Sequence, residues 1–142
     1  MKRIVVGIDG SDQGWSALAK AAELASATGA ALQIVHVSSP RTPQYAAENF
    51  QVEDAAWIAA EKAWSQGLLR DASARVQVAG LEVISVSKHG TPAETIAELA
   101  QPPEVTMVVI GHRGRNLAAR LLIGSVADRL VQISPKAVLV VR

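Results

Sequence analysis

The sequence contains no cysteine, few aromatic residues, almost no net charge and no long hydrophobic run. The absence of cysteine excludes disulfides, thiol chemistry and cysteine-ligated metals, and three scattered histidines argue against a transition-metal site. Aromatic residues make up only 4% of the chain, so we expect a core of Val, Ile, Leu and Ala. A formal net charge of +1 provides no overall attraction to nucleic acid or to anionic membranes, and we expect neither as a partner.

Hydrophobic segments long enough for export or for membrane insertion are also missing. The first apolar run, Ile4 to Ile8, is broken by Gly7 and ended by Asp9, which is shorter than the roughly 7–15 apolar residues of a secretory signal. No segment approaches the ~20 continuous apolar residues of a membrane-spanning helix. We therefore expect a soluble, cytoplasmic protein whose 142 residues form one domain, 1–142.

The residues that are present alternate between two patterns. Five runs rich in β-branched residues predict strands: "KRIVVGID", "ALQIVHV", "LEVISVS", "VTMVVIG" and "AVLVVR". Four stretches between them predict helices: about 12–28, about 46–78, a third beginning at Thr91, and about 125–133. Most of the strand runs are apolar almost throughout, as in strands covered on both faces. This alternation predicts an α/β fold, a doubly wound parallel sheet with helices on both faces.

Capping signals mark several helix ends. Gly29 follows the first helix and is a plausible residue for a left-handed C-terminal turn. Thr91, Pro92 and Glu94 together form the pattern of an N-cap, a first-position proline and a capping box.

An aromatic stripe occupies one face of the long second helix. Phe50, Trp57 and Trp64 recur every seven residues, so they share a face. The stripe is either a ligand platform or, as is more usual for aromatic residues at helical spacing, part of a core or an interface.

The glycine-rich loops select a strand order. Ligands of open parallel sheets bind at the carboxyl ends of the strands, where the strand order reverses. The loops "GIDGSDQG" and "GHRGR…GS" follow the first and fourth strands, and they are neighbours across one crevice only in the order 3-2-1-4-5. We therefore prefer 3-2-1-4-5 to the other common order, 2-1-3-4-5.

The loop after the fourth strand has the composition of an anion site. Gly111 and Gly114 allow backbone N–H groups to approach an anion and permit positive φ angles. Gly124 and Ser125 then begin a helix, whose N-terminus offers unpaired N–H groups. Three arginines supply positive charge nearby: Arg113, Arg115 and Arg120. This combination suits a ligand with two or three phosphates better than a single carboxylate.

Two residues have alternative explanations that need no ligand. Ser125 and Asp128 also fit a capping box, with Ser125 as the cap. Asp9 could hydrogen-bond a ribose hydroxyl or lie near a phosphate-bound Mg²⁺, or it could cap the first helix, a role for which Ser11 and Asp12 compete.

Several familiar nucleotide and hydrolase motifs are absent from the sequence. It contains no G-x-x-x-x-G-K-[ST], no G-x-G-x-x-G and no G-x-S-x-G. The acidic pair and the lysine of a phospho-accepting receiver domain are missing as well. His36 is expected to be a packed or edge residue, and no carboxylate is placed to orient His112, so we identify no catalytic residue.

The spacing Gly111-x2-Gly114-x9-Gly124-Ser125 resembles the nucleotide-binding motif of the universal stress protein family. The segments "IVVGIDGS", "GALQIVHV", "HGTPAETI" and "LLIGSVADRLVQISPKAVLVVR" are also similar to that family, so the resemblance covers nearly the whole chain. It implies the adenine nucleotide alpha-hydrolase-like fold with order 3-2-1-4-5, ATP binding with Mg²⁺, and a stress-response or signalling role with at most slow hydrolysis.

The resemblance also implies the contacts of the nucleotide. Asp9 would meet the ribose, the backbone of Val37 the adenine, and the other residues the pocket wall and phosphates: Ile110, Gly111, Arg113, Gly114, Gly124, Ser125 and Val126. Family members usually form homodimers through the last strand, here "AVLVVR". The alternative function is a dimeric protein-interaction module with a vestigial nucleotide pocket.

Overall fold

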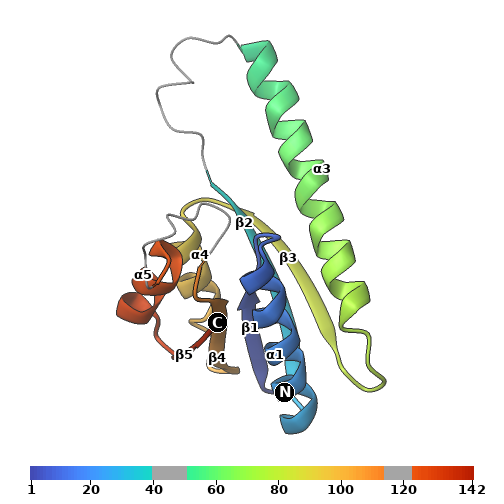
Figure 1. Ribbon diagram of the computed structural model, residues 1–142, viewed down its shortest axis with the longest axis vertical. Helices are drawn as coiled ribbons and strands as arrows, with labels where there is room; N and C mark the ends of the chain where they lie inside the picture. Colours follow the sequence, from blue (N-terminus) through green and yellow to red (C-terminus); the bar gives the residue numbers. More distant parts are fainter. Residues whose placement is uncertain (40–50, 114–122) are drawn as a thin grey trace.

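The computed structural model describes residues 1–39, 51–113 and 123–142, in which strands and helices alternate along the chain (Figure 1). The strands are β1 (Arg3–Gly7), β2 (Ala31–Ser38), β3 (Val83–His89), β4 (Val105–Gly111) and β5 (Ala137–Val141). The helices are α1 (Asp12–Thr28), α3 (Gln51–Arg75), α4 (Pro92–Leu99) and α5 (Ser125–Ile133).

The described strands form a parallel sheet in the order β3-β2-β1-β4-β5, which confirms the predicted topology. In the central strand, Val6 pairs in register with Ile34 of β2 and with Val109 of β4. Both Val5 and Val6 are fully buried although their side chains point to opposite faces. A sheet covered on both sides explains why the strand sequences are apolar almost throughout.

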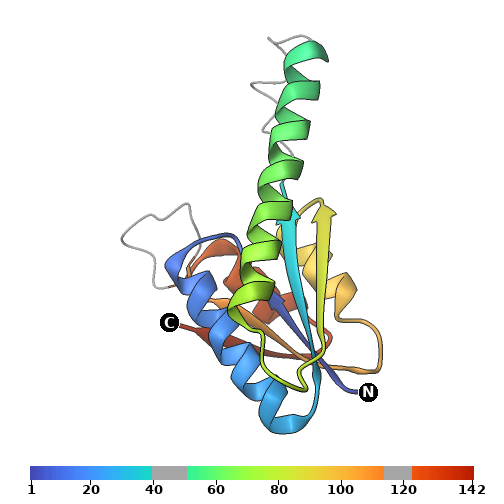
Figure 2. The same ribbon diagram turned by 90° about the vertical axis from the view of Figure 1, so that its right-hand side faces the viewer.

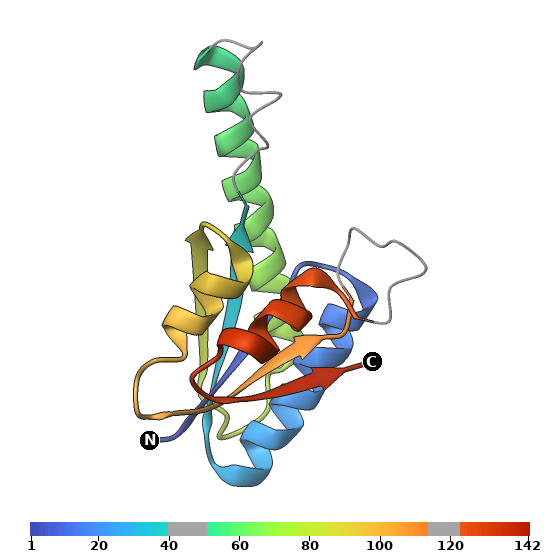
Figure 3. The same cartoon turned by 90° about the vertical axis from the view of Figure 1, so that its left-hand side faces the viewer.

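The helices divide into two layers, one on each face of the sheet. Helices α1 and α3 cover one face, where Val6 packs in one apolar cluster with Leu18 and Leu69 (Figure 2). Helices α4 and α5 cover the other face, where Val5 packs in a second cluster with Leu130 (Figure 3). The carboxyl ends of the parallel strands therefore meet at one edge between the two layers. None of the described helices is both long and apolar enough to cross a membrane.

The ends of α1 agree with the local sequence signals. The hydroxyl oxygen of Ser11 accepts a hydrogen bond from the backbone N–H of Gly14 at 3.0 Å, so Ser11 is the N-cap. At the other end, Gly29 adopts the left-handed conformation with φ 68°, which side chains other than glycine rarely adopt. The prediction at Gly29 is confirmed, whereas the sequence left the N-cap open among Asp9, Ser11 and Asp12, of which the structure selects Ser11.

Neither of the two predicted capping boxes forms, although both helices, α4 and α5, are present. Thr91 and Pro92 begin α4 as predicted, but the Thr91 side chain makes no capping hydrogen bond. The Glu94 carboxylate instead accepts a hydrogen bond from Nε of Arg129 in α5 at 3.0 Å. In α5 the N-cap is Gly124 and not Ser125.

The N-terminal turns of helix α3 project away from the rest of the protein (Figure 1). Its predicted start near residue 46 and Phe50 lie outside the described residues, and the helix continues through Gly67 to Arg75. Of the described side chains in 55–75, those before Ser65 are exposed or half-buried, whereas Ser65 is fully buried. Trp64 is 37% exposed and packs one ring edge against His36 of β2, so it contributes to the packing of α3 on the sheet.

Candidate functional site

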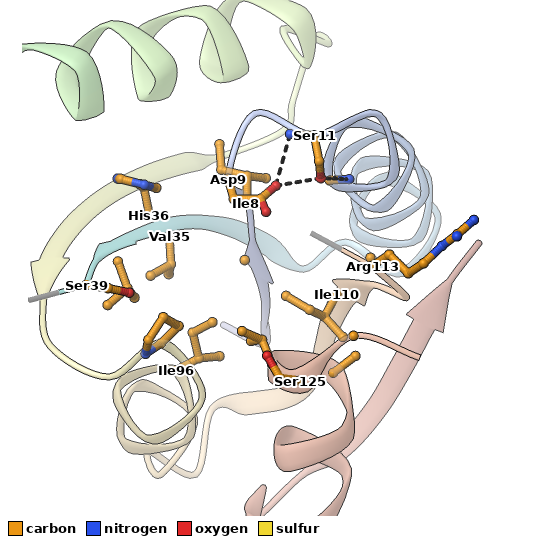
Figure 4. Close-up of a pocket in the computed structure, with 18 of the residues that line it drawn as sticks. Ile8, Asp9, Ser11, Val35, His36, Ser39, Ile96, Ile110, Arg113 and Ser125 are labelled. Atoms are coloured by element: carbon orange, nitrogen blue, oxygen red, sulfur yellow. Dashed lines mark hydrogen bonds between the residues drawn. The ribbon is translucent and has the colours of Figure 1, made fainter. Parts of the chain in front are cut away.

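A cavity of about 440 Å³ opens at the carboxyl ends of β1, β2 and β4, at the point where the strand order reverses (Figure 4). Parallel topology alone places a site there, because the first turns of helices from both layers converge on this edge. Eight of the nine residues predicted from the sequence line this cavity: Asp9, Val37, Ile110, Gly111, Arg113, Gly124, Ser125 and Val126. The ninth, Gly114, lies outside the described residues.

The turn after β1 holds Asp9 in a defined orientation. Oδ1 of Asp9 accepts hydrogen bonds from the backbone N–H of Ser11 at 3.0 Å and from its hydroxyl at 2.5 Å. Gly10 between them has φ 84°, which allows the chain to turn back on itself. Asp9 therefore does not cap α1 directly. It supports Ser11, which is the cap, while it also lines the cavity.

Gly111 lies where β4 meets the start of α1. A Cβ atom added to Gly111 would be 2.8 Å from the carbonyl carbon and 2.9 Å from the carbonyl oxygen of Gln13. Among the described glycines, those with positive φ are at positions 10, 29, 80 and 90, so Gly111 does not adopt the left-handed conformation that we considered for it. Glycine is required here by the close approach of two backbones. This approach brings the end of β4 against the turn that carries Asp9.

The start of α5 forms the opposite wall of the cavity. Gly124 is extended, with φ −72° and ψ 158°, and its N–H donates to the carbonyl oxygen of His112. Because Gly124 has no side chain, it cannot cap the first N–H groups of α5, and the first turn of a helix leaves such groups without intrahelical partners. Ser125, Val126 and Ala127 of that first turn line the cavity. The alternative in which Ser125 serves as the cap of a capping box, and needs no ligand, is therefore excluded.

Two arginines near this wall each donate a hydrogen bond to another side chain. Nε of Arg113 donates a hydrogen bond to Nε2 of His112 at 3.0 Å, and the side chain extends away from the centre of the cavity (Figure 4). Arg129 holds the pKa of the Glu94 carboxyl below its ordinary value through a hydrogen bond and its charge.

Within the described ranges, no group of three or more His, Asp or Glu side chains could hold a metal ion.

The chain is similar to known proteins over its whole length. The model of the universal stress protein family matches residues 1–142. The chain belongs to the universal stress protein family. Universal stress protein YxiE of Bacillus subtilis is 30% identical over 148 residues, covering 99% of this chain and 98% of that protein.

Solved structures of other family members have the same fold. Universal stress protein UspA from Lactobacillus plantarum is 26% identical, with a TM-score of 0.75 over 99% of this chain and 97% of that one. A universal stress protein crystallised in complex with cAMP is 28% identical, with a TM-score of 0.74 and the same coverage of both chains. The strand order predicted from the glycine-rich loops is thus the order of a known fold.

The sequence did not reveal several pocket residues of this universal stress protein. His36, treated as a packed strand residue, lines the cavity although it is only 4% exposed. Pro92 and Ile96 reach the cavity from α4, and Glu61 reaches it from α3. The segment "KHGTPAE" before α4 is explained by an ordinary strand-to-helix turn, so its sequence does not indicate a cavity residue. No local signal indicates Glu61, because its position depends on how α3 crosses the sheet. The sequence offered one indication for His36: it is adjacent to Val37, which was predicted to be a site residue.

Proposed function

We propose that this universal stress protein binds ATP, with Mg²⁺ on the phosphates, in the cavity at the carboxyl ends of β1, β2 and β4. The observation that carries the proposal is the joining of three features in one cavity: the carboxylate of Asp9, the β2 end at Val37 and the uncapped first turn of α5. These features are far apart in the sequence and differ in chemistry. Together they suit a ligand that has hydroxyl groups, a flat apolar part and an anionic end.

The cavity has a partial positive charge on one wall and apolar surface on another, which matches the phosphates and the base of a nucleotide. Backbone N–H groups and the partial positive charge of a helix N-terminus favour phosphates near Ser125 and Val126. Asp9 is placed to accept hydrogen bonds from ribose hydroxyls, and Ile96 with Val37 provides apolar surface for a base. A volume of about 440 Å³ lies within the range of roughly 300–1,000 Å³ typical of small-molecule sites.

The residues present support nucleotide binding more than rapid turnover. The described part of the cavity holds Asp9, Glu61 and His36 as titratable side chains besides Arg113. None of them is on the phosphate wall formed by α5, where a general base would have to activate a water molecule. We infer a stress-response or signalling module that hydrolyses ATP slowly at most.

Mass spectrometry of the ligand released from freshly purified protein tests this proposal. We expect an adenine nucleotide, and calorimetry with MgATP should show saturable binding that raises the melting temperature. Binding of cAMP in place of ATP would assign the cavity to a cyclic nucleotide, as in the relative crystallised with cAMP. The absence of binding for every adenine nucleotide would overturn the proposal and favour a dimeric interaction module with a vestigial pocket.

We further propose that the protein forms a homodimer through β5. This strand is at one edge of the sheet, and Val138 to Val141 are half-buried in the single chain. An apolar edge strand with unpaired backbone groups favours pairing with another strand. The opposite edge, β3, ends in Ser87, Lys88 and His89, which are exposed and polar. Pairing of β5 with its own copy would cover the apolar edge.

A further inference from the structure

Glu61 brings a carboxylate from α3 to the wall of the cavity. It is half-buried, whereas both of its neighbours along the helix, Ala60 and Lys62, are exposed. None of the ion pairs between described residues includes Glu61. The side chain therefore differs from an ordinary solvent-facing glutamate of a helix, because it lines a cavity and has no ion-pair partner among the described residues.

The packing of α3 on the sheet explains how Glu61 reaches the cavity. Because α3 connects two parallel strands, it runs opposite to them, and its earlier turns lie toward their carboxyl ends. Ser65 is hydrogen-bonded to β2, and the Trp64 ring lies 3.4 Å from the position of a Cβ on Gly10. Glu61 precedes Ser65 by one helical turn, so it shares that face of the helix and lies about 6 Å further along the axis. This places Glu61 on the same side of the cavity as the turn that carries Asp9.

The two sides of the cavity differ in charge. Figure 4 shows Asp9 on the side toward α3 and Ser125, the first residue of α5, on the opposite side. Glu61 adds a second carboxylate on the α3 side. On the other side, the N-terminus of α5 carries a partial positive charge, and Arg113 adds a full charge although its side chain extends away from the centre. The cavity is therefore negative toward α3 and positive toward α5.

The carboxylates determine which groups the α3 side of the cavity accepts. A carboxylate accepts hydrogen bonds from hydroxyl groups, and it repels a phosphate because the two charges have the same sign. Dinucleotide-binding folds show the same contrast: an acidic residue accepts a ribose hydroxyl, whereas an arginine accommodates a ribose phosphate. With the phosphates at α5 and the ribose at Asp9, a second carboxylate beside the ribose disfavours any ligand with an anionic group there.

We propose that Glu61 is a specificity-determining residue, which together with Asp9 selects nucleotides whose ribose hydroxyls are both free. Nucleotides with a phosphate on the 3′ oxygen, including 3′,5′-cyclic nucleotides, are disfavoured by the same two carboxylates. The inference rests on the proposed binding of an adenine nucleotide, and it narrows the ligand class to 5′-phosphates with a free diol. Because α3 supplies Glu61, the glycine-rich loops alone do not encode this selectivity.

The first test compares AMP with adenosine 3′,5′-bisphosphate, two ligands that differ only in the 3′-phosphate. Calorimetry should show that the unchanged protein prefers AMP. Glu61→Gln keeps the length of the side chain and one acceptor oxygen but removes the charge. We expect it to bind the bisphosphate about fivefold more tightly, because a like-charge repulsion is lost, and AMP about twofold more weakly, because a neutral amide is a weaker acceptor. Changes in opposite directions cannot come from a general loss of structure.

A matched control removes the same charge from α3 at a site away from the cavity. Asp71 is an exposed residue of α3 that pairs with Arg75 at 3.3 Å, and Asp71→Asn should leave both affinities unchanged. Salt provides a second readout, because dissolved ions screen the repulsion between charges. The preference of the unchanged protein for AMP should therefore narrow as the ionic strength rises, and it should narrow less in Glu61→Gln.

The outcomes separate this inference from the proposed function. If the unchanged protein binds no adenine nucleotide, or binds cAMP in place of ATP, the proposed function itself fails. If it binds ATP and AMP, and the ratio of the AMP and bisphosphate affinities is the same in Glu61→Gln as in Asp71→Asn, only the role of Glu61 fails. Equal affinity of the unchanged protein for AMP and the bisphosphate, or a bisphosphate that still does not bind to Glu61→Gln, would overturn that role as well.

Discussion

The hydroxyl of Ser11 donates a hydrogen bond to Oδ1 of Asp9 and accepts one from the N–H of Gly14, so one side chain both caps α1 and orients a cavity carboxylate. Ser11→Ala should therefore lower the free energy of unfolding by about 1 kcal/mol, the usual cost of losing a cap. It should also weaken MgATP binding, because Asp9 loses a support. Urea unfolding and calorimetry measure the two effects. Ser16→Ala, which removes only an exposed hydroxyl bonded to the Asp12 carbonyl, is the control.

A substitution of Gly111 tests whether the close approach of two backbones explains why glycine occupies the end of β4. Gly111→Ala would place a Cβ 2.8 Å from the carbonyl carbon of Gln13, and the backbone would have to move, so we expect a loss of about 1–3 kcal/mol in urea unfolding. Gly67→Ala is the matched control, since the added Cβ would meet open space beyond its chain neighbours and the backbone of its own helix. In the helix α3 this control should be neutral or stabilising by up to about 1 kcal/mol. A tolerated Gly111→Ala would contradict the geometry.

The start of α5 allows the anion site to be removed without disturbing the helix. Ser125 is the first helical residue, where proline is favoured, and the extended conformation of Gly124 suits a residue before proline. Ser125→Pro removes one N–H and one hydroxyl, so MgATP affinity should fall at least tenfold while adenosine affinity is unchanged. Ser125→Ala removes the hydroxyl alone and should have a smaller effect. Unchanged MgATP affinity in both variants would place the phosphates elsewhere.

The proposed dimer can be tested at β5 without touching the cavity. Val140 is half-buried in the single chain and lies on the edge strand. Val140 packs against the apolar cluster beneath α4 and α5, so Val140→Lys places a charge beside that cluster and on the β5 edge. We expect a shift from dimer to monomer in analytical ultracentrifugation, with the fold retained in circular dichroism. Val131→Lys on α5 is a control at a site already 57% exposed. A dimer that persists in Val140→Lys would require a different interface.

Much of the fold could be predicted because its signals are local. The five strand runs, the end of α1 at Gly29 and the start of α4 at Pro92 each depend on a few neighbouring residues. The strand order also followed from the sequence, because only one common order makes the two glycine-rich loops neighbours. Of the nine site residues named from the glycine-rich loops and from the family resemblance, eight line the cavity.

Tertiary packing decided what those local signals could not. The predicted capping box at Thr91 and Glu94 does not form, and the Glu94 carboxylate instead accepts a hydrogen bond at 3.0 Å from Arg129, 35 residues later in the sequence. His36 and Ser65 face each other because α3 packs across β2 at these two residues. The point at which a helix crosses a strand cannot be predicted from the spacing of residues along the chain. The sequence by itself determined the order of the elements and the loops that surround the cavity. Only the tertiary structure decided which side chains meet across it, since such contacts depend on how two helical layers pack on one sheet.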